Sequence, residues 1–196
     1  MLMLVQVLLL AAFALDGVSS CDARSLIANH EGKRNCVYKD TMGIKTIGIG
    51  FNLETPGARA AIAKVGADYD SIVSGKTCLT DQQVNELFEP SYQSAVSGAS
   101  RAVSSFSSLC CNVQEIMIDM DYNLGDGGFA SFTGFIGYIN AKDWANAAAD
   151  GRGTAWCGRH FRFDTCRHPV LQSDEAEPEC QREPSHAGDP FAKAVV

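Results

Sequence analysis

The chain has 196 residues and a mass of 21.0 kDa, which is enough for one well-buried domain or two small lobes that share a core. Hydrophobic residues make up 46% of the chain and charged residues 20%, and these fractions exclude a wholly disordered protein. The formal net charge of −7 excludes a strongly basic protein that binds polyanions by charge alone.

Residues 1–20 have the pattern of a secretory signal peptide. The first fifteen are apolar except for Gln6, a run too short to span a bilayer comfortably, and small residues follow. A buried core helix is the alternative, but a helix that is apolar on every side is unusual at a chain terminus. The segment therefore predicts a secreted, extracellular protein that begins at Cys21 and has no stable membrane insertion.

The eight cysteines are even in number, and all of them follow the predicted signal. An oxidising compartment favours their pairing in disulfides. Zinc is the competing interpretation, but no C-x-x-C spacing occurs and no histidine lies at ligand spacing from a cysteine pair. The connectivity stays open, although the adjacent Cys110 and Cys111 should bond to different partners.

The next predicted element is a helix over 22–31, with Asp22 as its cap and Gly32 as its stop. Glu31 then lies at the C-terminal end, where the helix dipole disfavours an ionised carboxylate and should raise its pKa. A raised carboxyl pKa suits a general acid near neutral pH. An ordinary residue at a helix end is the plainer interpretation of the same glutamate.

Residues 35–39 and 45–51 are predicted to form a hairpin, because they are rich in β-branched and aromatic side chains. Asp40 and Gly43 suit the first and fourth positions of a type I turn between them. Such a turn brings Asp40 and Thr46 onto neighbouring strands, where a carboxylate and a hydroxyl can hold one water. An acid facing that water would give the geometry of inverting glycoside hydrolysis, although a turn-forming role alone is the alternative for Asp40.

The rest of the chain predicts a helical lobe. Thr80 and Gln83 form a capping box that begins a helix to about Ser97, and a Ser-rich connection follows over 98–108. Further helices are expected over 58–65, 109–124, 132–139, 144–149 and 155–161. An α+β fold follows, in which a long helix joins the small hairpin lobe to the helical lobe and a cleft lies between them. Residues 172–196 are acidic and predict a disordered tail.

Three motifs of the hairpin lobe belong together: His30-Glu31-Gly32, residues 37–43 and residues 46–50. They resemble the active-site segment of the phage-type lysozymes, glycoside hydrolase family 24, and Glu31, Asp40 and Thr46 reproduce the family's spacing of Glu, Asp and Thr. Leu79-Thr80-Asp81 and Asn123-Leu124-Gly125 extend the resemblance over residues 22–171. It implies a lysozyme-like, two-lobed catalytic domain over 21–171. Together with secretion and cysteines, it indicates an animal member of the family, such as one from a bivalve or another marine invertebrate.

The resemblance also implies roles for individual residues. Glu31 would protonate the glycosidic oxygen, Asp40 would act as general base on the attacking water, and Thr46 would help to hold that water. Four further residues fall where the family contacts the glycan, the last two of them differing in type from the phage residues: Asn52, Tyr122, Phe135 and Asp150. An aromatic face can stack on a sugar ring, so Tyr122 is the best of the four, with helix packing as its alternative.

The implied activity is that of a secreted muramidase. Such an enzyme hydrolyses the β-1,4 bond between N-acetylmuramic acid and N-acetylglucosamine of bacterial peptidoglycan, in antibacterial defence or digestion. The resemblance implies a monomer with no metal or organic cofactor and no nucleic-acid partner. A non-catalytic peptidoglycan- or chitin-binding protein and a chitin or chitosan hydrolase are the alternatives.

Two departures from the family affect these expectations. Phe51 stands where the phage enzyme has a histidine, so a buried ion pair made there is absent, and disulfides could offset the loss of stability. The segment after Trp156 diverges from the family's closing helices, and a Cys157–Cys166 bridge is predicted within it.

Overall fold

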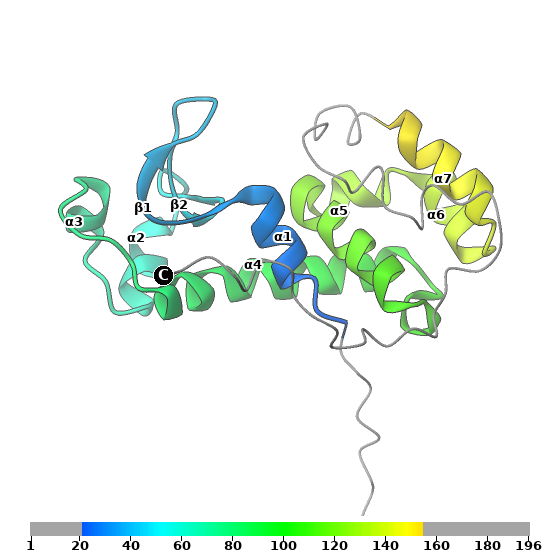
Figure 1. Cartoon of the computed structure of the whole chain (residues 1–196), viewed down its shortest axis with the longest axis horizontal. Coiled ribbons are helices and arrows are strands. Elements are labelled where there is room, and N and C mark those ends of the chain that lie inside the picture. The colour runs from blue at the N-terminus through cyan, green and yellow to red at the C-terminus, as the bar shows by residue number, and fades with distance from the viewer. Residues whose placement is uncertain (1–20, 155–196) are drawn as a thin grey trace, which may run out of the picture.

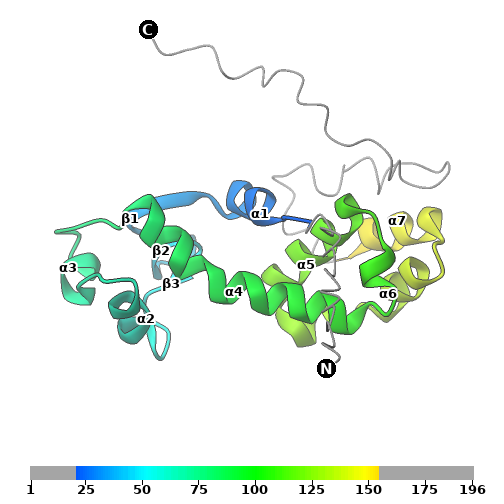
Figure 2. The ribbon, with the colours of Figure 1, turned by 90° about the horizontal axis from the view of Figure 1, so that it is seen from below.

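The computed structural model describes residues 21–154. Its elements, in chain order, are α1 (Arg24–Glu31), β1 (Lys33–Lys39), β2 (Lys45–Ile49), β3 (Phe51–Asn52), α2 (Ala58–Lys64), α3 (Tyr69–Val73), α4 (Asp81–Ala102), the 3₁₀ turn η1 (Phe106–Ser108), α5 (Cys111–Ala130), α6 (Thr133–Asn140) and α7 (Trp144–Gly153). The sheet lies with α2 and α3 in a small lobe, and α4 runs from it to a helical lobe of α5, α6 and α7 (Figures 1 and 2). This arrangement confirms the predicted α+β, two-lobed fold.

Several predictions lie outside the described residues. These are the signal peptide over 1–20, the helix over 155–161, the Cys157–Cys166 bridge and the acidic tail over 172–196. Within residues 21–154, no helix is both long enough and apolar enough to cross a bilayer.

Helix α1 ends where the sequence predicts. Gly32 adopts a left-handed φ of 76°, and its N–H donates to the carbonyl of Ala28 at 3.0 Å. The helix begins two residues later than expected, with Ala23 as its N-cap, while the Asp22 carboxylate accepts a hydrogen bond from the Arg24 N–H at 3.0 Å. Ile27 is fully buried, which fixes the helix against the core and leaves Glu31 at its last position.

The predicted hairpin is confirmed. Strand β1 pairs antiparallel with β2, which pairs in turn with the short β3. The turn between β1 and β2 closes through a hydrogen bond from the Gly43 N–H to the Asp40 carbonyl at 3.0 Å, as a type I turn requires. In this register Tyr38 lies opposite Thr46, so Asp40 and Thr46 are diagonal neighbours rather than a facing pair.

Helix α4 begins at the predicted capping box, in which the Thr80 hydroxyl accepts from the Gln83 N–H and the Gln83 amide accepts from the Thr80 N–H. It continues to Ala102 instead of ending near Ser97. Gly98 and Ala99 are both buried, so tertiary packing offsets the poor helix propensity of this Gly- and Ser-containing segment.

Helix α5 contains a kink where the sequence predicts its end. Gly125 has a φ of 70° and a ψ of 163°, outside the helical region, and the helix resumes beyond it to Ala130. Helices α6 and α7 then pack against each other. Helix α3 was not expected from the Gly- and Ser-containing sequence around it; the Asp68 side chain caps it by accepting from the Ser71 N–H at 2.8 Å.

Two disulfides join cysteines that both lie within residues 21–154. Cys21–Cys111 joins the segment before α1 to the start of α5, and Cys36–Cys78 joins β1 to the segment before α4. Cys110 is also disulfide-bonded, so it has a partner different from that of Cys111, as predicted. Buried apolar side chains of both lobes belong to one hydrophobic cluster, which holds the lobes as one body.

Candidate active site

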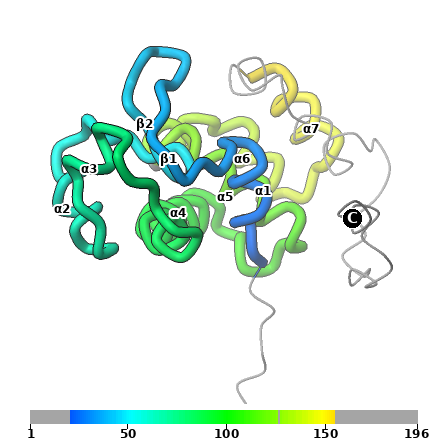
Figure 3. Tube along the Cα trace, turned by 60° about the vertical axis from the view of Figure 1, so that its left-hand side comes forward, coloured from blue at the N-terminus to red at the C-terminus, as the bar shows by residue number. Residues whose placement is uncertain are grey.

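A cleft of about 850 Å³ opens between the two lobes. The hairpin and α7 rise on the same side of α4, with α1 and α5 between them (Figures 1 and 3). The lining comes from the end of α1, the hairpin turn, the junction of β2 and β3, α4 and α5: Glu31, Asp40, Met42, Gly50, Ser91, Ser94, Ala95, Asp121, Tyr122, Asn123 and Gly125. The fold thus brings Glu31 and Asp40, nine residues apart in the chain, to the wall of one cleft.

Glu31 is half-buried at the C-terminal end of α1. Its pKa is raised, as the sequence predicts, but the first cause is burial, and the negative charge of Asp119 is the second. The neighbouring His30 acts in the opposite direction and lowers the Glu31 pKa. A carboxyl that holds its proton to higher pH is suited to donate it to a leaving group.

Asp40 has one oxygen engaged and one open. Its Oδ1 accepts hydrogen bonds from the N–H groups of Met42 at 2.8 Å and Ile44 at 2.9 Å, which fix the side chain across the turn. Its Oδ2 makes no hydrogen bond with any residue that the structure describes. An ionised carboxylate held in this way has an oxygen that can accept a hydrogen bond from a water in the cleft.

Thr46 is a buried residue of β2, within the hairpin itself. It is only 4% exposed, its hydroxyl donates to the Ile44 carbonyl at 3.2 Å, and it is not among the residues that line the cleft. Asp40 and Thr46 are therefore diagonal neighbours across β1 and β2. That they hold one water between them stays a prediction.

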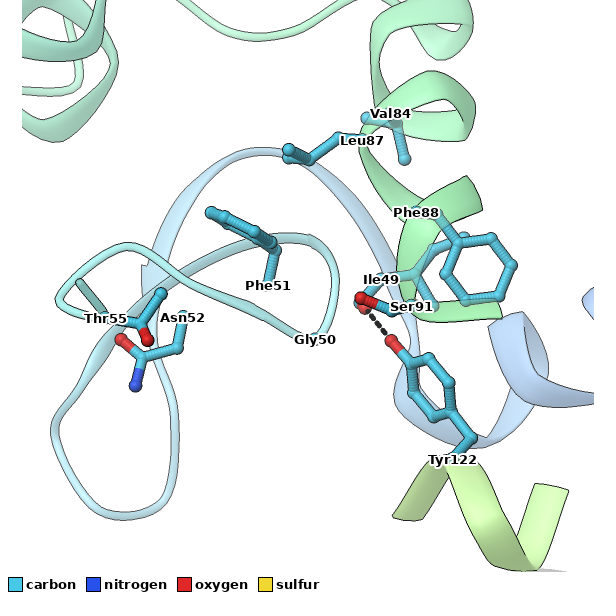
Figure 4. A pocket seen from close by; sticks show the side chains of 10 residues that line it. All are labelled: Ile49, Gly50, Phe51, Asn52, Thr55, Val84, Leu87, Phe88, Ser91 and Tyr122. Carbon is cyan, nitrogen blue, oxygen red and sulfur yellow. Dashed lines mark hydrogen bonds between the residues drawn. The ribbon is translucent and has the colours of Figure 1, made fainter. Parts of the chain in front are cut away.

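Tyr122 connects the cleft with a smaller cavity of about 220 Å³, because it lines both. Its hydroxyl donates to the Ile49 carbonyl at 2.9 Å, and its ring packs edge-on against Phe88 with centroids 5.5 Å apart (Figure 4). Helix packing thus uses part of this side chain, and the remainder faces the cleft. Asn52 lies on the opposite side of the same cavity, where its Oδ1 accepts from the Glu54 N–H at 2.7 Å (Figure 4).

The other two expected glycan contacts lie elsewhere. Phe135 is 0% exposed, and a Cβ added at Gly151 would come within 3.1 Å of its ring. It therefore belongs to the packing between α6 and α7 and has no surface to offer a sugar. Asp150 is exposed on α7 but is not among the residues that line the cleft. Neither residue joins Glu31 and Asp40 in this geometry.

Two aspartates of α5 belong to the site and were not singled out from the sequence. Asp121 is 2% exposed and lines the cleft, and Asp119 is fully buried and contacts His30. A signal for them was present, because both acids interrupt the otherwise apolar run of residues 116–122. Buried carboxylates are rare without a partner or a function.

An α+β fold with carboxyl groups on the walls of a cleft between two lobes defines a lysozyme-like protein. A family model described as phage lysozyme matches residues 28–158, more than half of the chain. The chain therefore belongs to the phage lysozyme family, a family of glycoside hydrolases that act on bacterial peptidoglycan. The match extends from within α1 through α7 and so covers both walls of the cleft.

Proposed function

We propose that this chain is a secreted muramidase of animal origin that hydrolyses the β-1,4 bond between N-acetylmuramic acid and N-acetylglucosamine, in antibacterial defence or digestion of bacteria. The observation that carries the proposal is the presence of Glu31 and Asp40 on one inter-lobe cleft in a chain of the phage lysozyme family. The disulfides Cys21–Cys111 and Cys36–Cys78 are compatible with an oxidising, extracellular compartment.

In the proposed reaction, Glu31 is the general acid. Burial and the charge of Asp119 raise its pKa, so the carboxyl keeps its proton to higher pH and can give it to the glycosidic oxygen as the bond to the leaving sugar breaks. Without that proton the departing oxygen would leave as an alkoxide, which is a poor leaving group. Ionisation of Glu31 should therefore end activity as the pH rises.

Asp40 is the proposed general base. Two backbone N–H groups hold its Oδ1, which leaves Oδ2 to accept a proton from a water that attacks the anomeric carbon from the side opposite the leaving group. Thr46, a neighbour of Asp40 across the two strands, would help to hold that water. Attack by water in a single step inverts the anomeric configuration. No step needs a metal or an organic cofactor.

The proposed glycan contacts are Tyr122 and Asn52, together with Asp150 on the exposed surface of α7. Tyr122 presents an aromatic side chain to the cleft, and such faces stack on sugar rings. Asn52 is exposed at the cavity that continues from the cleft beyond Tyr122. A monomer suffices for the proposed chemistry, since both carboxyl groups come from one chain.

Glu31→Gln tests the proposal directly. The amide cannot donate an acidic proton, so the rate of lysis of purified peptidoglycan should fall by about a hundred- to ten-thousand-fold. Glu86→Gln is the matched control, because it makes the same chemical change at an exposed position of α4 away from the cleft wall, and it should keep the full rate. Lysis by Glu31→Gln at the unaltered rate would contradict the proposed acid.

Product analysis separates this proposal from its alternatives. The freshly released reducing end should carry the α anomer, which NMR observes before mutarotation, since inversion converts a β linkage. A β product would contradict the role of Asp40 as a base on water. Binding to wall fragments with no release of reducing ends would indicate a non-catalytic binding protein. Faster turnover of chitin oligomers than of peptidoglycan would assign a different glycan.

A further inference from the structure

The residue that precedes the proposed acid makes a buried contact across the molecule. The Nδ1 atom of His30 lies 3.1 Å from both carboxyl oxygens of Asp119. The two side chains are 11% and 1% exposed, and the contact joins the last turn of α1 to the middle of α5. A carboxylate accepts hydrogen bonds only, so an ionised Asp119 requires the proton on Nδ1 of His30.

Asp119 is held from its own helix as well. The Asn123 amide donates to the Asp119 carbonyl at 2.9 Å and to its Oδ1 at 3.3 Å. Burying a carboxylate is costly unless hydrogen bonds or an opposite charge compensate it, and His30 and Asn123 together supply that compensation. Because Asn123 also lines the cleft, polar contacts lead from His30, the residue before Glu31, through Asp119 to a residue of the cleft lining.

The charged and titratable groups around Glu31 come from several elements. Asp119 raises the Glu31 pKa and His30 lowers it. The charge of Glu31 in turn contributes to the raised pKa of the Tyr122 and Tyr38 hydroxyls. Two further acids line the same cleft: Asp40 and Asp121. Among the charged groups of residues 21–154, Asp119 and His30 are the ones that shift the pKa of Glu31.

We propose that His30 and Asp119 are positioning residues for the acid Glu31: their contact fixes the last turn of α1 against α5 and holds a buried negative charge beside the acid carboxyl. The inference rests on the proposed function, because it assigns these residues a role in that same site. Neither residue needs to touch the glycan. The contact thus has two effects, the position of the last turn of α1 and the negative charge beside Glu31. Different substitutions remove each of them.

Asp119→Asn removes the charge and keeps the shape. The amide oxygen can still accept from His30, so the pH-independent maximum of kcat should be retained within about twofold. The high-pH limb of the activity profile, where Glu31 loses its proton, should move to lower pH by about half a unit or more. Glu115→Gln is the matched control, because it removes a carboxylate four residues earlier on α5. The charge that acts on Glu115 is that of Asp22 rather than that of Glu31, so the high-pH limb should not move.

His30 variants test the geometry. His30→Ala removes the contact, and kcat should fall by about tenfold or more with little change in KM, because a displaced acid slows chemistry more than binding. His30→Asn places an amide N–H three bonds from Cα, as Nδ1 is, and should restore most of kcat. Thermal melting of each variant identifies any loss that comes from unfolding. Equal loss in the Ala and Asn variants would overturn the positioning role.

A direct titration keeps this inference distinguishable from the proposed function. The ¹³C chemical shift of the Glu31 carboxyl reports its pKa whether or not the protein lyses walls. A lower Glu31 pKa in Asp119→Asn, in a protein that lyses no peptidoglycan, would support the contact and contradict the proposed activity. An active protein whose Glu31 pKa and high-pH limb match those of Glu115→Gln would overturn the inference and leave the activity standing.

Discussion

At the scale of the residue, the space around Glu31 depends on a glycine. Gly50 follows β2 with a φ of 71°, and a Cβ built on it would lie 3.1 Å from Oε2 of Glu31. Both properties favour glycine at this position, the first because L side chains rarely adopt that φ and the second because the carboxyl occupies the space. Gly50 thus lets the backbone approach the proposed acid closely.

Gly50→Ala should therefore impair both stability and activity. The left-handed backbone costs a non-glycine residue about 1–2 kcal/mol, and the new methyl group should displace the Glu31 carboxyl and slow wall lysis by about tenfold or more. Gly66→Ala is the matched control, since Gly66 has a φ of 74° and nothing within 4 Å of an added Cβ. Denaturant unfolding should show a similar loss in both variants, whereas equal lysis rates would contradict the crowding of Glu31.

The site could be predicted from the sequence in part. The positions of Asp40 in a turn and of Glu31 at a helix end could be predicted, because turn residues and helix-stop glycines are local signals. Phe135 could not be placed in this way, since its burial depends on how α6 packs against α7. The contact between His30 and Asp119 joins residues 89 positions apart, a separation that no local pattern encodes.

At the scale of the element, α5 is two helical segments joined at Gly125. The backbone there, with a φ of 70° and a ψ of 163°, lies in a region that is essentially restricted to glycine. The first segment carries Asp119, Tyr122 and Asn123 to the site, and the kink ends that segment at the cleft, which Gly125 itself lines. A straight continuation would redirect the chain that leads to α6.

Two glycines of α5 should respond to the same substitution with opposite sign. Gly125→Ala should destabilise the fold by about 1–3 kcal/mol, because alanine is strained in that conformation. Gly127→Ala should instead stabilise it by up to about 1 kcal/mol, since Gly127 lies in a helical, exposed position with nothing within 4 Å of an added Cβ. Urea denaturation measures both, and destabilisation of equal size would contradict a conformational role specific to Gly125.

The boundaries of the elements show the same division between local and tertiary causes. The sequence predicted where α4 begins, since the capping box of Thr80 and Gln83 is a local hydrogen-bonded motif. It misplaced the end, because the burial of Gly98 and Ala99 extends the helix beyond its intrinsic propensity. Gly125 is a local stop signal, but the renewed helix beyond it depends on packing in the second lobe.

At the scale of the whole molecule, the covalent links and the charge distribution complement the fold. Cys21–Cys111 joins cysteines 90 positions apart. It links the segment before α1, the helix that carries Glu31, to the start of α5, the helix that carries Asp119. Such links stabilise chiefly by restricting the unfolded chain.

The net charge of residues 17–171 is only −2, whereas residues 172–196 carry −4, so the body that holds the cleft is nearly neutral.

This charge distribution predicts that wall lysis depends weakly on salt. Bacterial walls are anionic, and a strongly basic lysozyme would lose long-range attraction as the Debye length shortens from about 30 Å at 0.01 M to about 8 Å at 0.15 M. A nearly neutral body has little such attraction to lose, so the lysis rate should change by less than about twofold over that range. Turbidity of wall suspensions measures the rate, and hydrolysis of an uncharged glycan oligomer under the same conditions controls for effects of salt on the fold. A steep fall confined to the anionic wall would show that a local positive surface, rather than the net charge, governs association with the substrate.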